Sequence, residues 1–347
     1  MRVLILILLF SSLFSKEIDT FYGKLDVEEA VLLELIDHPA FQRLHSIHQY
    51  GIAYYTTHPE EYSRYDHSLG VFAILRIKGA SLEEQIAGLL HDVSHTAFSH
   101  VGDWVFGKEN QEKDYQNSIH AEFIKSSGVE EVLNKYGMRV EEIIPTQHDF
   151  PALECPLPDL CADRIDYNIQ GAFYRGFITH EEALSIIQDL KFVEKKWVGT
   201  NLKLLKKLAH FSLEMTQSCW GGACNYLSSM WFAEAILRAV ELGDLSLHDF
   251  QFGKDDMIWN LLQNHTDRII KKKMSMLIRP HLHYSVVSRV NANLIVKSKF
   301  RGIDPWVVVD GKLTRLTLLD PDLAKDYVSV KGRLEQGEPL KIYEEIL

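Results

Sequence analysis

Two histidines and two aspartates form an ordered series of candidate metal ligands in this sequence. They are His67, the adjacent pair His91 and Asp92, and Asp163. Imidazole nitrogens and carboxylate oxygens together suit a borderline to hard divalent ion, but they do not select among Mn, Fe, Zn, Co, Ni and Mg. The sequence therefore predicts a site for a divalent metal ion whose identity stays open.

The adjacent pair limits where the backbone around it can be helical. Successive side chains on a helix point about 100° apart, so His91 and Asp92 can bind one ion together only near a helix end. Residues 81–84 (SLEE) form a capping sequence before the apolar residues Ile86, Leu89 and Leu90. This pattern predicts a helix that starts after Ser81 and ends near Asp92.

The elements that would position these residues are mostly helical. A capping sequence at Asp26 precedes apolar residues at helical spacing, which predicts a helix that Pro39 ends or restarts. We expect the whole body, residues 16–280, to be all-α. Further helices are predicted after His67, Ser81, Tyr115, Pro158, His180 and Asn201, and the longest covers residues 226–242.

The pattern changes beyond Pro280. Residues 284–287, 294–296 and 306–309 are β-branched runs, and Asp310-Gly311 is a strong hairpin turn signal before residues 313–316. We therefore predict a mainly α fold, in which a helical body at residues 16–280 carries a small β-rich (α+β) C-terminal portion at residues 281–347.

The charge balance restricts the partners. A chain of 347 residues can form one large domain or two. Its formal net charge of −11 argues against a broad nucleic-acid-binding surface, which would normally be basic. The same charge repels anionic substrates, so a site that binds phosphate must supply local positive charge.

The first fifteen residues resemble a secretory signal peptide. Arg2 is followed by a short apolar run at residues 3–10 and by small residues before Lys16. The run is too short to span a bilayer as a helix. We predict that residues 1–15 direct export to the periplasm or the outside of the cell. The alternatives are a buried N-terminal element or an unrecognised start site, with a cytoplasmic protein.

The four cysteines leave the redox compartment open. Cys155 with Cys161, and Cys219 with Cys224, are close enough in sequence to form disulfides in an oxidising compartment. Neither spacing is a zinc motif. Buried free thiols are the alternative.

Three ordered motifs resemble the HD-domain phosphohydrolases. They are residues 64–71 (RYDHSLGV), 91–100 (HDVSHTAFSH) and 162–167 (ADRIDY). The closest branch is the one that contains the deoxynucleoside triphosphate triphosphohydrolases, and the likeness runs from about Lys16 to near the C-terminus, including residues 41–44 and 300–305. The alternative is that the four candidate ligands are unrelated surface or capping residues.

The resemblance implies hydrolysis of a nucleotide or a related phosphoester by a metal-activated water. A bound ion can lower the pKa of water from about 15.7 towards about 7, and it neutralises charge on phosphoryl oxygens. By resemblance, His95 is an active-site histidine that contacts phosphate, and His100 and His120 are further histidines of the substrate pocket. Asp103 orients His120, which donates a proton to the leaving oxygen. The alternative for His120 and Asp103 is a plain surface location.

The same resemblance assigns residues to substrate binding. Arg64 and Arg164 match phosphate-contacting positions, Tyr167 a substrate-packing position, and Gln49 a sugar-contacting position. Arginine suits phosphate because its planar fork donates two charge-assisted hydrogen bonds. For Arg164 the alternative is a structural ion pair with Asp166 or Glu154. Relatives often assemble as oligomers, so a homo-oligomer is expected.

Several departures concern substrate recognition. Tyr50 replaces the usual Leu beside the sugar, Ser94 and Thr96-Ala97 replace Gly and Gly-Pro, and Gln170-Gly171 replaces an Arg-Asp pair whose Asp helps to read the sugar 3′-hydroxyl. Residues 219–224 contain no Lys or Arg where a basic helix usually grips the polyphosphate. A triphosphohydrolase acting on deoxynucleotides is therefore the leading hypothesis, followed by a phosphomonoesterase or phosphodiesterase. A metal-retaining nucleotide-binding or regulatory module with little turnover is the alternative of a different class.

Overall fold

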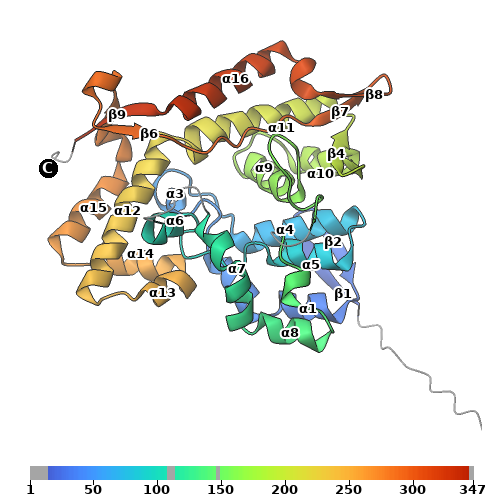
Figure 1. Cartoon of the computed structure of the whole chain (residues 1–347), viewed down its shortest axis with the longest axis horizontal. Helices are drawn as coiled ribbons and strands as arrows, with labels where there is room; N and C mark the ends of the chain where they lie inside the picture. Colours follow the sequence, from blue (N-terminus) through green and yellow to red (C-terminus); the bar gives the residue numbers. More distant parts are fainter. Residues whose placement is uncertain (1–14, 108–113, 146–148, 344–347) are drawn as a thin grey trace, which may run out of the picture.

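α-Helices dominate the structure, as predicted. The computed structural model describes residues 15–107, 114–145 and 149–343. Within these ranges the helices surround the middle of the molecule, and three small sheets lie towards its edges (Figure 1). The mainly α fold class is therefore confirmed, but the expectation that residues 16–280 are all-α is wrong, because two hairpins lie inside that range.

The first hairpin replaces the predicted helix start at Asp26. Strands β1 (Lys16–Thr20) and β2 (Gly23–Val27) pair antiparallel, with Ile18 opposite Leu25. Gly23 has a φ of +111°, a conformation that glycine adopts readily. Ile18 on β1 and Val27 on β2 are both buried, and this burial stabilises the paired strands. Helix α1 (Ala30–Ile36) therefore begins only after Glu29.

Three packed helices form the scaffold of the predicted site. Helix α4 (Arg64–Ile77) packs against α5 (Leu82–Leu90) and α9 (Ala162–Tyr174). Ser63 and Asp66 make a reciprocal capping box that starts α4, and Ser81 accepts the amide hydrogen of Glu84 to start α5. As predicted, α5 ends at Leu90 with His91 as its C-cap, which allows His91 and Asp92 to face the same point.

The remaining helices confirm the other predicted helical stretches. A second layer at the other side of the molecule consists of α12 with α3, α6, α14 and α15 packed around it (Figure 1). The bounds are α2 (Pro39–Gln42), α3 (Ile52–Thr56), α6 (Val101–Phe106), α7 (Tyr115–Ser126), α8 (Val129–Lys135), α10 (His180–Asp189), α11 (Leu202–Met215), α12 (Ala223–Leu242), α13 (Leu247–Phe252), α14 (Asp255–Gln263), α15 (Arg268–Ile278) and α16 (Pro321–Gln336).

Two sheets include the predicted C-terminal strands. One sheet has the order β3-β4-β7-β8 and the other has the order β5-β9-β6. The turn at Asp310-Gly311 joins β7 to β8 with positive φ at both residues, as the hairpin signal predicted. The bounds are β3 (Lys191–Val193), β4 (Lys196–Gly199), β5 (Tyr284–Val286), β6 (Leu294–Val296), β7 (Trp306–Val309), β8 (Lys312–Arg315) and β9 (Glu338–Ile342).

The C-terminal portion is joined to the body by backbone pairing. Strand β7 pairs in parallel with β4, so one sheet takes strands from both sides of residue 280. The portion also contains the long helix α16, which packs on α11 and which the β-rich prediction left out. A domain boundary at residue 280 stays a prediction.

Three smaller observations concern the earlier expectations. The predicted signal peptide, residues 1–15, lies outside the described residues except for Ser15. All four cysteines are free thiols, and Cys161 and Cys219 are buried, so the structure contains neither of the two disulfides considered. Among the helices that the structure describes, none has both the length and the apolar surface needed to cross a membrane.

Candidate metal centre and active site

The four predicted metal ligands converge on one point. His67 on α4 places its Nε2 atom 3.1 Å from His91 Nε2 and 3.0 Å from Asp163 Oδ1, at the start of α9. Carboxylate oxygens of Asp92 lie 3.6 Å from His67 Nε2 and 3.5 Å from His91 Nε2. Residues that are far apart in the sequence thus meet within the reach of a single ion.

The hydrogen bonds around the two imidazoles leave their Nε2 lone pairs facing each other. His67 Nδ1 lies 2.7 Å from Asp166 Oδ2, and His91 Nδ1 lies 2.7 Å from the Gly88 carbonyl oxygen. Each acceptor fixes the proton on Nδ1, so Nε2 is free to act as a ligand. The Nε2 lone pairs of His67 and His91 and the Asp163 carboxylate then face one another, and none of them carries a hydrogen to donate. This donor set requires a cation between its members and fits a divalent metal ion.

Asp166 holds His67 in this orientation, and sequence reasoning gave it no such role. Its side chain is fully buried and also accepts hydrogen bonds from Tyr22 Oη at 2.8 Å and Tyr62 Oη at 3.0 Å. Gln170 Nε2 donates to the same carboxylate. Asp166 lies three residues after Asp163 on α9, and this helical spacing near a metal ligand was the available signal.

Gly70 leaves the space that Asp166 occupies. A Cβ atom at Gly70 would lie 2.0 Å from Asp166 Oδ1 and 2.6 Å from Gln170 Nε2. We expect Gly70→Ala to displace the Asp166 carboxylate and to weaken metal binding by about tenfold or more, as loss of a partner to a ligating histidine does. Calorimetric titration with Mn²⁺ measures this change, and Gly332→Ala on α16, where a Cβ meets open space, is the matched control. Unchanged affinity in Gly70→Ala would refute the role given to Asp166.

The carboxylates of the site favour protonation of His67 when no metal competes. Burial lowers the pKa of His67, but hydrogen bonds to Asp163 and Asp166 outweigh it and raise the pKa to about 10. Burial alone would raise the pKa of Asp92, but the charge of Arg64, together with the contacts to His91 and His95, holds it well below its usual value. Both ligand aspartates are therefore anionic at neutral pH, since the pKa of Asp163 is also lowered.

This balance predicts that metal binding strengthens with pH. A metal ion must displace the proton from His67, so its apparent affinity should rise by up to about tenfold per pH unit below about pH 10. For the metal-free protein, the contribution of His67 to the stability of the fold has the opposite pH dependence and falls as the pH rises. A raised histidine pKa stabilises the fold below about pH 6.5, and this stabilisation is lost as the pH rises towards 10. Titrations with Mn²⁺ between pH 6 and 8 test the prediction, which a pH-independent affinity would contradict.

Both arginines predicted to bind phosphate are engaged within the protein. Arg64 is buried, and its guanidinium donates to Asp92 through Nη1 and to Ser99 Oγ through Nε. Arg164 donates to Glu154 Oε1 at 3.1 Å and to the Asp159 carbonyl oxygen at 2.8 Å. The structural alternative for Arg164, a pair with Glu154, is therefore the arrangement that the structure contains.

The predicted pairing of Asp103 with His120 is wrong. Asp103 Oδ2 instead lies 3.3 Å from His100 Nδ1, three residues earlier at the start of α6, and its Oδ1 accepts the Tyr115 amide hydrogen. His120 Nδ1 lies 2.8 Å from Ser94 Oγ. Ser94 stands where the resemblance expects glycine, so its hydroxyl takes the position beside the His120 ring.

Two of the predicted active-site histidines are buried and neutral. Burial lowers the pKa of His120 to about 4 and, together with the charge of Arg64, that of His95 to about 3. His95 Nε2 lies 3.3 Å from Asp92 Oδ1, while its Nδ1 and the Nε2 of His120 have no hydrogen-bond partner among the described residues. Both histidines therefore keep one ring nitrogen available.

Of the residues predicted to pack on the substrate or to contact its sugar, Tyr167 lies beside this centre. Tyr167 is partly buried, with its ring centroid 6.4 Å from His67 and 5.2 Å from Trp220. Gln49 is partly buried and its Oε1 has no partner among the described atoms. A Cβ at Gly171 would lie 3.2 Å from Tyr50 Oη, so the Tyr50 phenol fills the space next to the glycine.

A second missed residue, Asp255 on α14, connects two loops of the site. Its buried carboxylate accepts the amide hydrogen of Phe98 at 2.6 Å and that of His48 at 2.8 Å. Phe98 and Ser99 both have positive φ, which costs non-glycine residues free energy. Asp255 thereby stabilises the loop after His95, and no local motif marks it because its partners are more than 150 positions away.

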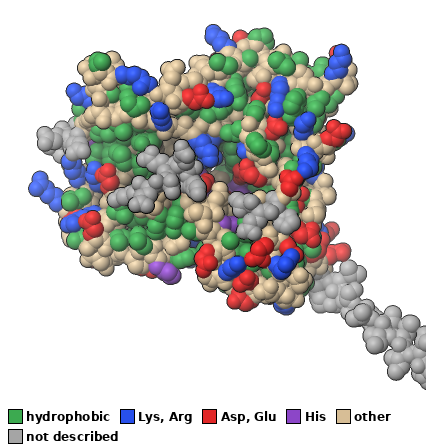
Figure 2. Space-filling model, viewed as in Figure 1, with side chains coloured by type: hydrophobic (Ala, Val, Ile, Leu, Met, Phe, Trp, Pro, Cys, Tyr) green, Lys and Arg blue, Asp and Glu red, His purple; other side chains and the backbone are tan. Residues whose placement is uncertain are grey.

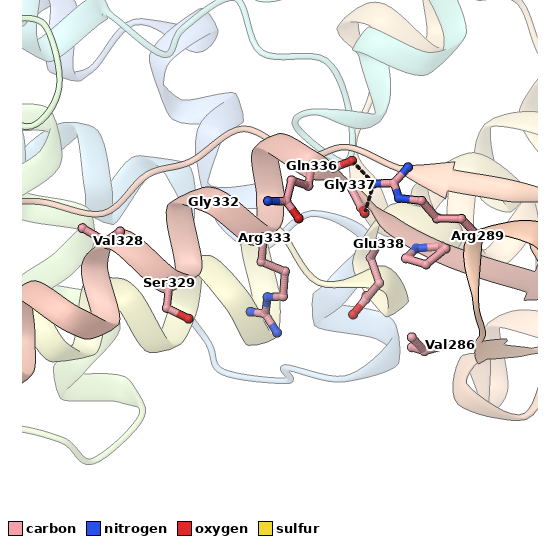
Figure 3. Close-up of a pocket in the computed structure, with 10 residues that line it drawn as sticks. Val286, Arg289, Val328, Ser329, Gly332, Arg333, Gln336, Gly337 and Glu338 are labelled. Carbon is pink, nitrogen blue, oxygen red and sulfur yellow. Dashed lines mark hydrogen bonds between the residues drawn. The ribbon is translucent and has the colours of Figure 1, made fainter.

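The described surface shows two different hollows. Figure 2 shows histidine and basic side chains within a hollow near the middle of the drawn face. A separate groove of about 620 Å³ runs between α16 and the sheet of β5 and β9 (Figure 3). In that groove Arg289 donates to the carbonyl oxygens of Gln336 and Gly337, and none of the predicted site residues lines it.

The helical scaffold and the convergent donors define the class of a metal-dependent hydrolase domain, and the comparisons agree. The family model of the HD domain matches residues 64–168. The uncharacterized protein YdhJ of Bacillus subtilis is 30% identical over 325 residues, which cover 93% of this chain and 98% of YdhJ. The chain belongs to the HD-domain family of metal-dependent phosphohydrolases, and the predicted requirement for a divalent metal is confirmed at the level of this family.

Other relatives match over shorter segments. The metal-dependent phosphohydrolase cns2 of Cordyceps militaris is 36% identical over 173 residues, half of this chain and 49% of cns2. The human deoxynucleoside triphosphate triphosphohydrolase SAMHD1 is 33% identical over 147 residues, 36% of this chain and 23% of SAMHD1. A crystal structure of a phosphohydrolase from Bacteroides thetaiotaomicron shares the fold, with a TM-score of 0.66 at 18% identity over 95% of this chain and all of that one.

Proposed function

We propose that this phosphohydrolase acts on a nucleotide or a related phosphoester, and that a deoxynucleoside triphosphate is the first substrate to test. The observation that carries the proposal is the meeting of His67, His91, Asp92 and Asp163 with their donor atoms directed at one point. The choice of a triphosphate is supported by the partial similarity to SAMHD1.

Each residue around the metal centre has a separate role in the proposed hydrolysis. When bound, a divalent ion supplies Lewis-acid chemistry that polarises a phosphoryl oxygen and provides a water nucleophile at neutral pH. Asp166 keeps His67 in the ligating tautomer, and Arg64 balances the charge of Asp92. We assign the proton donor for the leaving oxygen to His100, because Asp103 lies within hydrogen-bond distance of its Nδ1 atom and orients the ring.

A phosphomonoester is the second candidate substrate, and the cations of the site favour it. Arg64 and Arg164 are held in pairs, and residues 219–224 carry no Lys or Arg. Each charge-assisted hydrogen bond to phosphate contributes about 1.5–3 kcal/mol, so a polyphosphate tail would lack several of them. The Tyr50 phenol against Gly171 also restricts the room beside the expected sugar position.

A substrate panel distinguishes these proposals. The protein is loaded separately with Mn²⁺, Mg²⁺, Zn²⁺, Co²⁺, Ni²⁺ or Fe²⁺ and incubated with nucleoside mono-, di- and triphosphates, and the released phosphate, pyrophosphate and triphosphate are measured. Triphosphate release supports the leading proposal, whereas phosphate release from monoesters supports the second. Tight nucleotide binding without turnover under every metal would overturn both and favour the binding module.

Assembly and location stay proposals. We propose a homo-oligomer, which light scattering on the purified protein tests. We also propose that residues 1–15 direct export, and N-terminal sequencing of the protein from its host tests this. An intact Met1 would reject export and favour a cytoplasmic protein.

A further inference from the structure

Arg301, in the C-terminal portion, is a cation whose side chain remains available for a ligand. In the described part of the chain, no hydrogen bond or ion pair engages its guanidinium, and the residue is partly exposed. Arg64 and Arg164, by contrast, have carboxylate partners within the protein. An unpaired guanidinium retains all its donors for a ligand.

The backbone around Arg301 is held firmly against the catalytic body. Ser212 Oγ on α11 donates to the Arg301 carbonyl oxygen at 3.2 Å, and the Asp304 amide donates to the Pro158 carbonyl oxygen at 3.0 Å. A Cβ at Gly302 would lie 2.8 Å from Leu213, and Ile303 is fully buried. The segment between β6 and β7 therefore runs alongside α11, which itself packs on α9 (Figure 1).

The charge of Arg301 acts on residues at two sides of the centre. Burial raises the pKa of Tyr167 on α9, and the Arg301 charge opposes this rise most strongly. Burial also raises the pKa of Asp103 on α6, but the bond to His100 and the charges of His100 and Arg301 lower it overall. The charge of Arg301 therefore acts both on Tyr167, the tyrosine predicted to pack on the substrate, and on the His100–Asp103 pair.

We propose that Arg301, contributed by the C-terminal portion, binds the phosphate group of the substrate at the metal centre. The inference rests on the proposed function, because it names the group that anchors the phosphate in that site. It supplies the local positive charge that a chain of net charge −11 needs for an anionic substrate. One unpaired arginine, with the exposed Lys299 two positions before it, suits a single phosphoryl group better than a triphosphate tail.

Binding of inorganic phosphate to the Mn²⁺-loaded protein tests the assignment without turnover. We expect Arg301→Ala to weaken phosphate binding about 10- to 100-fold in calorimetric titrations, because two charge-assisted hydrogen bonds are lost. Arg301→Lys should recover part of the affinity, since the point charge remains without the fork. The melting temperature and the Mn²⁺ affinity should match the wild type. Arg268→Ala on α15, which removes the same charge from an exposed position, should leave phosphate binding unchanged.

The outcomes separate this inference from the proposed function. Equal phosphate affinity in wild type and Arg301→Ala, or no binding by the wild type at millimolar phosphate, overturns the assignment even if the enzyme hydrolyses nucleotides. If Arg301→Ala binds phosphate more weakly and the wild type hydrolyses no substrate of the panel, the assignment is supported and the proposed hydrolysis is overturned. With an active enzyme, the substitution should raise KM for a phosphomonoester at least as much as it lowers kcat.

Discussion

Replacing Asp92 by alanine is expected to abolish hydrolysis and to reduce the metal content of the purified protein. Asp92 lies within 3.6 Å of both ligand histidines and is also the carboxylate partner of Arg64. Its loss removes one ligand and leaves the buried Arg64 without its anion. Since a metal ion provides several kcal/mol of transition-state stabilisation, the rate should fall on the order of 10³-fold or more.

The measurement pairs metal analysis by mass spectrometry with initial rates on the best substrate of the panel. Asp326→Ala on the exposed face of α16 is the matched control, because it removes a carboxylate outside the site. The control should keep wild-type rate and metal content. An Asp92→Ala protein that stays folded and hydrolyses at the wild-type rate would contradict metal-assisted catalysis at this position.

Replacing Asp166 by asparagine should produce the second largest effect. The Asp166 carboxylate accepts hydrogen bonds from His67, Tyr22, Tyr62 and Gln170. An asparagine offers only one acceptor oxygen, and its NH2 group would face some of these donors without an acceptor. We expect metal affinity to fall about 10- to 100-fold. Unpaired buried donors should also reduce the free energy of unfolding by about 1–3 kcal/mol.

Titration with Mn²⁺ and urea unfolding measure the two effects separately. Asp326→Asn provides the same chemical change at an exposed position and should alter neither quantity. If Asp166→Asn lost stability but kept full metal affinity, Asp166 would be a structural residue only, and the tautomer argument for His67 would fail.

The metal centre could be predicted because its information is local. His91 and Asp92 follow a clear capping and apolar pattern, so the helix end that lets both face one ion could be derived from residues 81–92. The β7–β8 hairpin was predictable for the same reason, since Asp310-Gly311 determines the turn type. Local chemistry decides these elements, and distant contacts do not change them.

The corrections arise where distant contacts decide. Helix α1 does not start at Asp26 as predicted, because residues 23–27 pair with β1 and this pairing buries Val27. The strand pairing outweighs the local capping pattern. Asp103 pairs with His100 rather than His120 because residues three positions apart at the start of a helix are neighbours, while the Ser94 hydroxyl already contacts Nδ1 of His120. A sequence motif identifies these residues but does not say which pairs form.

The substrate-facing residues were the least predictable part of the site. Arg64 and Arg164 matched phosphate-binding positions by type, yet the buried Asp92 engages Arg64 and the exposed Glu154 engages Arg164. We propose that Arg301 belongs to the same site, although it follows Tyr167 by more than a hundred residues, so spacing gave no reason to group the two. Tertiary packing of residues 300–305 on α11 determines this arrangement.

Crystallography of the Mn²⁺-loaded protein with anomalous scattering tests the central claim most directly. We predict one strong anomalous peak within about 2.0–2.4 Å of His67 Nε2, His91 Nε2 and an oxygen of Asp163 and of Asp92. A fully loaded protein whose anomalous peak lay elsewhere, or touched none of these four side chains, would contradict the account.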